Sequence, residues 1–361
     1  RGLLEPRAAD ALVVTHPPNV RYLTNHAGSA GAAVLAAGAV HLLADFRYTE
    51  AVRQLQASPH ACPDLVLRDV PDSYDDAIVA SLADLGPARA AVEASYLSVA
   101  RFEWLRRTIA ARGLPVELIA VESPIDAARQ IKDAWELGAL RESAARLPPV
   151  FDAACRAVRP GVAEREVAGA IEAAMRREGF ERAAFDTIVA SGPNGALPHY
   201  RAGDRRLTAG DLVVLDFGGV LDGYCCDLTR TVAVGAPDAE AVRVFEAVRD
   251  AQAAAIAAVR PGIAATAVDR AARAVLEARG LGPNFGHGTG HGLGLEVHEA
   301  PRITRPRPDL DAVALEPGMV FTIEPGAYLP GWGGVRIEDD VAVTAGGCEV
   351  LTAAPRELVV R

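Results

Sequence analysis

The sequence predicts an α+β protein with two domains, and three observations lead to that prediction. The N-terminal third alternates short apolar runs with helical patterns, the remainder contains an internal repeat, and four acidic residues of that remainder stand in apolar, β-prone runs. We expect a small α/β domain over residues 1–122 and a larger second domain over residues 123–361. A chain of 361 residues is long enough to form two hydrophobic cores.

Composition narrows the class of protein. Half of the residues are hydrophobic and 23% are charged, which is typical of a globular chain. The net charge of -10, without a basic block, argues against a general nucleic-acid binder. No apolar run approaches the length of a membrane span, the first residues lack the apolar core of a signal peptide, and the five scattered cysteines suit reduced thiols. We therefore expect a cytoplasmic protein that binds neither nucleic acid nor membrane.

Apolar periodicity and turn residues place the elements of the first domain. Strands are predicted at 11–15, 32–38, 39–45 and 86–94, and helices from 46 and over 95–113, where Gly113 provides a stop. A long helical pattern then runs from residue 131 to residue 158. We expect Pro148 and Pro149 to kink or divide it, because proline cannot continue a helix from its interior.

The second part of the chain contains a duplication. The block 159–162 is echoed by 260–263, and the block 207–218 by 315–326. In the second pair a leucine, a glycine, an acid and a final glycine fall in the same register, so that Asp216 corresponds to Glu324. Two matched blocks in the same order predict two halves related by a pseudo-twofold axis, with a site where the halves meet.

Four acidic residues require partners that the sequence does not supply. They are Asp216, Asp227, Glu324 and Glu338. A lone carboxylate in a buried strand is costly unless it is paired or neutralised. Arg230 and Arg336 are near in sequence but cannot serve all four carboxylates, whereas two divalent cations would balance their charge. We therefore predict a dinuclear metal site.

Histidines are concentrated in the glycine-rich segment 286–299, which contains His287, His291 and His298 among five glycines. A carboxylate-rich site with one imidazole suits Mn, Co, Fe or Zn, whereas Ca and Mg need no histidine. The glycines make a zinc-binding helix improbable here. A further histidine, His199, lies on a Gly/Pro-rich loop just before the first acidic strand.

The motifs DFG (216–218), DLTRT (227–231), the segment 286–299, TIEPG (322–326) and RIEDD (336–340) occur in this order. This set resembles the M24 "pita-bread" metallopeptidases, and within them the branch that contains Xaa-Pro aminopeptidase and Xaa-Pro dipeptidase. Residues 17–25 and 44–50 more weakly resemble the creatinase-like N-terminal domain. The resemblance implies a creatinase-like α/β domain over 1–122, followed by a pseudo-twofold pita-bread catalytic domain over 123–361.

The resemblance also implies roles for the matching positions. Asp216 would bind one metal ion, Asp227 and Glu338 would bridge two, and His291 and Glu324 would complete the second site. The implied catalytic residues are His298, which would stabilise the tetrahedral charge, Glu324 as proton shuttle, and His199. The implied pocket residues are His287, Arg336, Phe185 and Tyr328. Mn²⁺ is the favoured metal, with Co²⁺ or Zn²⁺ as alternatives.

Two activities of this branch compete. The segment 298–318 is short, which favours an open site and an Xaa-Pro aminopeptidase acting on peptides with proline at the second position. Arg302, Arg305 and Arg307 in that segment keep open the alternative, an Xaa-Pro dipeptidase whose arginine captures the dipeptide carboxylate. Methionine aminopeptidase and creatinase fit less well, because the first usually lacks such an N-terminal domain and the second lacks the metal ligands.

A non-catalytic binding module on the same fold is a more distant alternative to an enzyme. The family resemblance implies a homodimer, in which Arg47 either reaches the partner's active site or forms a surface salt bridge.

Overall fold

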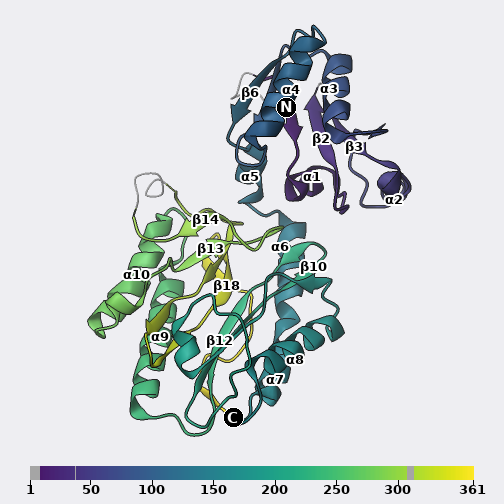
Figure 1. The fold of residues 1–361 in the computed structure, drawn as a ribbon. Coiled ribbons are helices and arrows are strands. Elements are labelled where there is room, and N and C mark those ends of the chain that lie inside the picture. The colour runs from purple at the N-terminus through teal and green to yellow at the C-terminus, as the bar shows by residue number, and fades with distance from the viewer. Residues whose placement is uncertain (1–8, 37, 307–312) are drawn as a thin grey trace. The chain divides into compact units, whose positions relative to one another are not determined.

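Two units, Arg1–Arg129 and Gln130–Arg361, make up the chain (Figure 1). The computed structural model describes residues 9–36, 38–306 and 313–361. Within these residues no helix is both long and apolar enough to span a membrane.

The first unit contains a six-stranded mixed sheet in the order β4-β3-β2-β1-β5-β6. Its strands are β1 (Ala11–Val14), β2 (Ala32–Ala36), β3 (Ala39–Ala44), β4 (Leu65–Asp69), β5 (Arg89–Glu93) and β6 (Glu117–Val121). Its helices are α1 (Pro17–Thr24), α2 (Phe46–Gln56), α3 (Tyr74–Leu85), α4 (Val99–Ala111) and α5 (Pro124–Arg129). The strands and helices predicted for residues 11–113 are confirmed, and α1, α3, α5, β4 and β6 are additions to them.

Arg47 lies at the start of α2, where its guanidinium pairs with Asp45 at 2.7 Å. This contact is the surface salt bridge that was one of the two alternatives predicted for Arg47. Since the pair forms within the first unit, it needs no partner subunit.

The second unit begins with three helices, α6 (Ala134–Ala145), α7 (Leu147–Ala157) and α8 (Glu164–Arg177). The predicted interruption at the prolines is confirmed, because α6 ends before Arg146 and both prolines stand in the first turn of α7. A proline is tolerated there, since the N–H that it lacks would have no partner within the helix.

The strands of the second unit form two main sheets. The first has the order β20-β12-β9-β8 and the second β14-β13-β15-β18-β19. Their bounds are β8 (Ile188–Ser191), β9 (Leu212–Phe217), β12 (Leu228–Ala233), β13 (Gly290–Gly292), β14 (Glu299–Ile303), β15 (Val320–Ile323), β18 (Asp339–Thr344), β19 (Gly347–Val350) and β20 (Val359–Val360). Two smaller sheets, in the orders β11-β10-β7 and β16-β17, contain the remaining strands: β7 (Arg182–Ala183), β10 (Gly219–Leu221), β11 (Tyr224–Cys225), β16 (Gly326–Leu329) and β17 (Gly333–Arg336).

Helices cover the two sheets from opposite sides. In Figure 1, α7 and α8 lie on one side of β12 and β18, and α9 (Ala239–Ala258) and α10 (Ala265–Ala278) lie on the other. Apolar side chains of α7 and α8 pack on β9 and β12, and those of α9 and α10 pack on β15 and β18. One face of the first sheet is therefore buried under α7 and α8, and one face of the second sheet is buried under α9 and α10.

The predicted duplication is confirmed down to individual backbone bonds. The N–H of Gly161 donates to the Leu207 carbonyl at 2.8 Å, and that of Gly262 donates to Leu315 at 2.8 Å. Isolated bridges join Ala163 to Arg206 in one half and Ala264 to Ala314 in the other. The repeat read from the sequence is therefore a repeat of structure, with α8 equivalent to α10 and β9 equivalent to β15.

Candidate active site

Each half of the second unit supplies two carboxylates from the same place in its pair of antiparallel strands. Asp216 lies near the end of β9 and Asp227 directly before β12, while Glu324 directly follows β15 and Glu338 directly precedes β18. Antiparallel pairing puts the end of one strand beside the start of the other. Only Asp216 stands within a strand as predicted; the other three stand at strand ends, where the chain leaves the ladder and side chains from several strands can converge.

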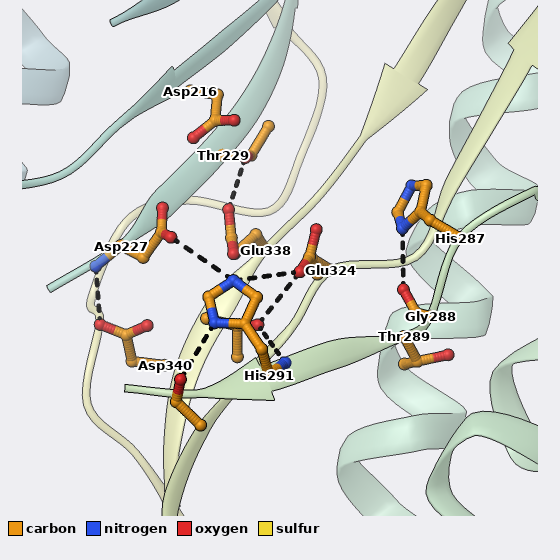
Figure 2. A network of polar contacts seen from close by, with 12 residues as sticks. Asp216, Asp227, Thr229, His287, Gly288, Thr289, His291, Glu324, Glu338 and Asp340 are labelled. Atoms are coloured by element: carbon orange, nitrogen blue, oxygen red, sulfur yellow. Dashed lines mark hydrogen bonds and ion pairs between the residues drawn. The ribbon is translucent and has the colours of Figure 1, made fainter. Parts of the chain in front are cut away.

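His291, on β13, points at this cluster (Figure 2). Its Nε2 lies 3.4 Å from Glu324 Oε1 and 4.0 Å from Asp227 Oδ2. Its Nδ1 lies 3.1 Å from the Gly292 carbonyl, which can only accept, so the ring proton is on Nδ1. The Nε2 lone pair then faces two carboxylates, an arrangement that favours a cation between them. Ligand atoms of Asp227, His291 and Glu338 all lie within 4.8 Å of one another.

The side chains of the protein do not neutralise the cluster. Asp216 receives a hydrogen bond from Arg336 at 2.5 Å, whereas Arg230 pairs with Asp339 instead. Among the described residues, Asp216 Oδ1 and Asp227 Oδ1 are buried without a hydrogen-bond partner. Buried oxygens of this kind need a hydrogen-bond donor or a metal ion. The donor set therefore fits divalent cations.

Burial also sets the protonation of the cluster. It raises the pKa of Asp227 and of Glu338 well above the ordinary range, and the neighbouring carboxylates raise both further. Burial raises the pKa of Glu324 as well and lowers the pKa of His291 to about 4. The imidazole is thus neutral at pH 7, which is the form that binds metal.

Neighbouring polar groups fix the orientation of the cluster. Thr229 Oγ1 donates to Glu338 at 2.5 Å, and Thr322 Oγ1 lies 3.3 Å from Glu324 while accepting from the His291 backbone. Asp340 accepts from the backbone N–H of Asp227 at 2.9 Å. We did not predict these supporting residues. Both threonines lie two positions from an acid, so they share its strand face, and that spacing could have identified them.

The cluster opens into a cavity of about 840 Å³. Of the residues predicted for the site, the lining includes Phe185, His199, Asp216, Asp227, His287, His291, His298, Glu324, Arg336 and Glu338. It also includes residues that we did not predict, among them Ile188, Tyr200, Arg201 and Val297. The histidines and carboxylates that are far apart in sequence thus face one common space.

Tyr328 is placed differently from the other predicted pocket residues. It is buried on β16 and is absent from the lining residues. Its hydroxyl lies 2.8 Å from His287 Nε2 and accepts from Arg336 Nη1 at 2.9 Å. Because His287 Nδ1 faces the Gly288 carbonyl, Nε2 is the acceptor in this pair. A chain of hydrogen bonds therefore runs from His287 through Tyr328 and Arg336 to Asp216.

His298 lies against His291, with ring centroids 4.3 Å apart. Burial, followed by the neighbouring His291, lowers the pKa of His298 to about 4. Its neutral ring can donate one hydrogen bond into the cavity. His199 is exposed on another part of the wall.

Close backbone approach explains one glycine beside His291. A Cβ on Gly290 would lie 1.8 Å from the Thr322 carbonyl oxygen, so an alanine would force β13 away from β15. We expect Gly290→Ala to lower the free energy of unfolding by about 3 kcal/mol or more, measured by urea denaturation. Gly286→Ala is the control, since no atom lies within 4 Å of a Cβ built there. Equal stability of the two variants would contradict the expectation.

Comparisons with known proteins agree with this geometry. The profile of Metallopeptidase family M24 matches residues 138–345, and that of the Creatinase/Prolidase N-terminal domain matches residues 1–131. The chain is 42% identical over 243 residues to the Xaa-Pro dipeptidase of Pyrococcus furiosus, an alignment that covers 67% of this chain and 69% of the relative.

Two solved structures resemble the whole chain. The Xaa-Pro dipeptidase from Bacillus anthracis has a TM-score of 0.93 at 34% identity and covers 100% of this chain and 98% of its own. The X-Pro aminopeptidase from Thermotoga maritima has a TM-score of 0.88 at 33% identity and covers 100% of both chains.

Proposed function

Since the chain belongs to metallopeptidase family M24, we propose that it hydrolyses the Xaa-Pro bond of dipeptides, as an Xaa-Pro dipeptidase. That it is a metallopeptidase follows from the family; the substrate is the proposal. It replaces the preference for an aminopeptidase that the short segment 298–318 suggested. The names of the relatives from P. furiosus and B. anthracis support the dipeptidase.

The observation that carries the proposal is the position of Arg302. It lies directly opposite His291 in the pairing of β13 with β14, so both side chains lie on the same face, and it lines the cavity. Among the described residues, no carboxylate lies within salt-bridge distance of it. A cation at this place suits the C-terminal carboxylate of a substrate that ends at proline. Arg305 instead donates to the Phe285 carbonyl, and Arg307 lies outside the described residues.

For the metals, we propose Asp216, Asp227, His291, Glu324 and Glu338 as ligands, with Mn²⁺ favoured over Co²⁺ and Zn²⁺. Two bound divalent ions would supply an activated water and polarise the scissile carbonyl. The positive charges of the two ions and of Arg336 would balance the negative charges of the four carboxylates and one hydroxide. The buried, partnerless oxygens of Asp216 and Asp227 support this assignment.

The side chains would then act on the peptide bond from two sides. Glu324, whose pKa is raised by burial, is suited to move a proton from the attacking water to the leaving proline nitrogen. His298 would donate to the carbonyl oxygen as negative charge develops on it. His199 and His287 would contact the rest of the substrate from the cavity wall.

Arg302→Ala tests the substrate class. We expect kcat/KM for Xaa-Pro dipeptides to fall about ten- to a hundredfold, since a hydrogen bond to a charged group contributes about 1.5–3 kcal/mol. The fall should come mainly from a higher KM, because the carboxylate is bound equally before and during reaction. Arg279→Ala, which removes an arginine that pairs with Asp250 and does not line the cavity, should behave as the wild type.

The second candidate is an Xaa-Pro aminopeptidase, favoured by the likeness to the T. maritima enzyme. Assays that compare Xaa-Pro with Xaa-Pro-Yaa separate the two activities. A wild-type enzyme that prefers the tripeptide, and an Arg302→Ala variant that cleaves both as before, would establish the aminopeptidase.

A further inference from the structure

We propose that Asp269 and Arg273, one turn apart on α10, form a clamp that positions His287 and Glu324 for the reaction. The inference rests on the proposed function only for its catalytic consequence. The side chains pair directly, with Arg273 Nε 2.6 Å from Asp269 Oδ2. Neither residue lines the cavity, so both are positioning residues rather than catalytic ones.

The clamp holds three successive points of one chain segment. Arg273 donates to the carbonyl of His287 and, at 3.0 Å, to that of Phe285. Asp269 Oδ1 accepts from the backbone N–H of Thr289 at 3.1 Å and from its hydroxyl at 2.9 Å. The pair thus binds alternate residues of 285–289, the segment that carries His287 into the cavity wall.

This segment needs an external support. It contains Gly286 and Gly288, and no helix or strand covers the residues between Asn284 and Gly290. Glycine gives the backbone more freedom than any other residue, so the segment alone would sample many conformations. Hydrogen bonds from a rigid helix restrict it to one.

The restraint reaches two functional groups. The imidazole of His287 is joined to Tyr328 at its other end, so the clamp fixes its backbone while Tyr328 fixes its ring. The carbonyl of Thr289 accepts from the backbone N–H of Glu324 at 2.8 Å. Movement of Thr289 would therefore displace a proposed metal ligand.

The burial of the Asp269–Arg273 pair indicates that it positions the segment 285–289 rather than stabilises the fold. Asp269 is fully buried and the Arg273 side chain is 12% exposed. An ion pair buried to this extent seldom stabilises a protein more than apolar side chains of the same size would. Asp269 and Arg273 together make four bonds to one loop, which apolar residues could not make.

The test compares Arg273→Gln with Arg279→Gln. Arg279 follows the same helix but pairs with Asp250 of α9, and among the described residues its side chain forms no hydrogen bond with the segment 285–289. Hydrogen exchange of the peptide that covers 285–291, Mn²⁺ titration of metal-stripped protein, and kcat/KM for Xaa-Pro are measured for both variants. Thermal unfolding of each variant verifies that it is folded.

In Arg273→Gln we expect exchange in this peptide to rise about tenfold, Mn²⁺ binding to weaken about tenfold, and kcat/KM to fall about tenfold or more. Arg273→Lys, which can reach one of the two carbonyls, should recover part of each loss. Arg279→Gln should change none of the three. Unchanged exchange and Mn²⁺ affinity in Arg273→Gln would overturn the clamp. If the wild type cleaves no Xaa-Pro peptide, the proposed substrate fails, while exchange and Mn²⁺ titration still decide on the clamp.

Discussion

Asp227→Asn is expected to abolish metal binding and peptide hydrolysis while making the metal-free protein more stable. Asp227 is buried beside Glu338 and Glu324, and one of its oxygens has no partner among the described residues. The amide removes a charge that the metal-free fold does not compensate. Its NH₂ group can also donate to the lone pair of His291, which in the wild type faces the carboxylate at 4.0 Å.

The magnitudes follow from the two opposite roles of this carboxylate. Loss of the metals removes several kcal/mol of transition-state stabilisation, so kcat/KM should fall about 10³-fold or more. In the presence of a chelator, replacing an uncompensated buried charge should raise the free energy of unfolding by about 1 kcal/mol or more. Excess Mn²⁺ should reverse the order, since it stabilises only a protein that binds it.

The pH dependence has a definite sign. The pKa of Asp227 is higher in the folded protein than in the unfolded chain, so the folded state holds more protons above pH 4 or so. The metal-free wild type should therefore lose stability as the pH rises from about 4 through the raised pKa. Because Glu338 and Glu324 share this behaviour, Asp227→Asn should reduce the slope rather than remove it.

Urea denaturation with and without Mn²⁺, between about pH 4 and pH 8, measures these effects, and elemental analysis measures the metal. The control is Asp250→Asn, which removes a partly exposed carboxylate of α9 that pairs with Arg279. An Asp227→Asn protein that keeps its metal, or a chelated variant less stable than the wild type, would contradict the site assignment. A wild type that binds neither Mn²⁺ nor Co²⁺ and cleaves nothing would indicate the non-catalytic module.

The repeat and the four carboxylates of the proposed site could be predicted from the sequence for a physical reason, whereas the choice of His291 among the histidines of 286–299 rests on the family resemblance. Carboxylates in apolar runs are costly, so Asp216 and Glu324 at matched places of a repeat indicate a shared site from the sequence alone. The glycines of 286–299 likewise argue against a helix, and the chain forms the short strand β13 there.

Other parts of the site depend on contacts between residues far apart in the chain. The Asp269–Arg273 pair follows ordinary i,i+4 spacing, which on any helix is most often a surface ion pair. The pair binds the segment that begins at Phe285, and this contact depends on the packing of α10 beside that segment, which the sequence does not show. Tyr328 matched a pocket-wall position in sequence, yet its hydroxyl lies between His287 and Arg336 and its side chain is buried.

His298→Ala is expected to lower kcat/KM about 10²- to 10³-fold, which is the loss that removal of one oxyanion-stabilising donor causes in other enzymes. The metal content of the variant should be unchanged. His298 lines the cavity and lies against the ring of His291, but it is not one of the five side chains that we propose as metal ligands. Its loss should therefore affect the reacting carbonyl and not the metal ligands. Most of the effect should fall on kcat, because the charge develops only in the transition state.

The pH profile distinguishes this role from that of a titrating acid. Because burial lowers the pKa of His298 to about 4, the ring is neutral between pH 6 and pH 8, and its N–H donates without a change of charge. The activity ratio of wild type to His298→Ala should thus be constant over that range, as measured by kcat against pH. His60→Ala, an exposed histidine of the first unit, provides the control. A ratio that declines as the pH rises would assign a protonated imidazolium to the reaction, and loss of metal from His298→Ala would make His298 a ligand.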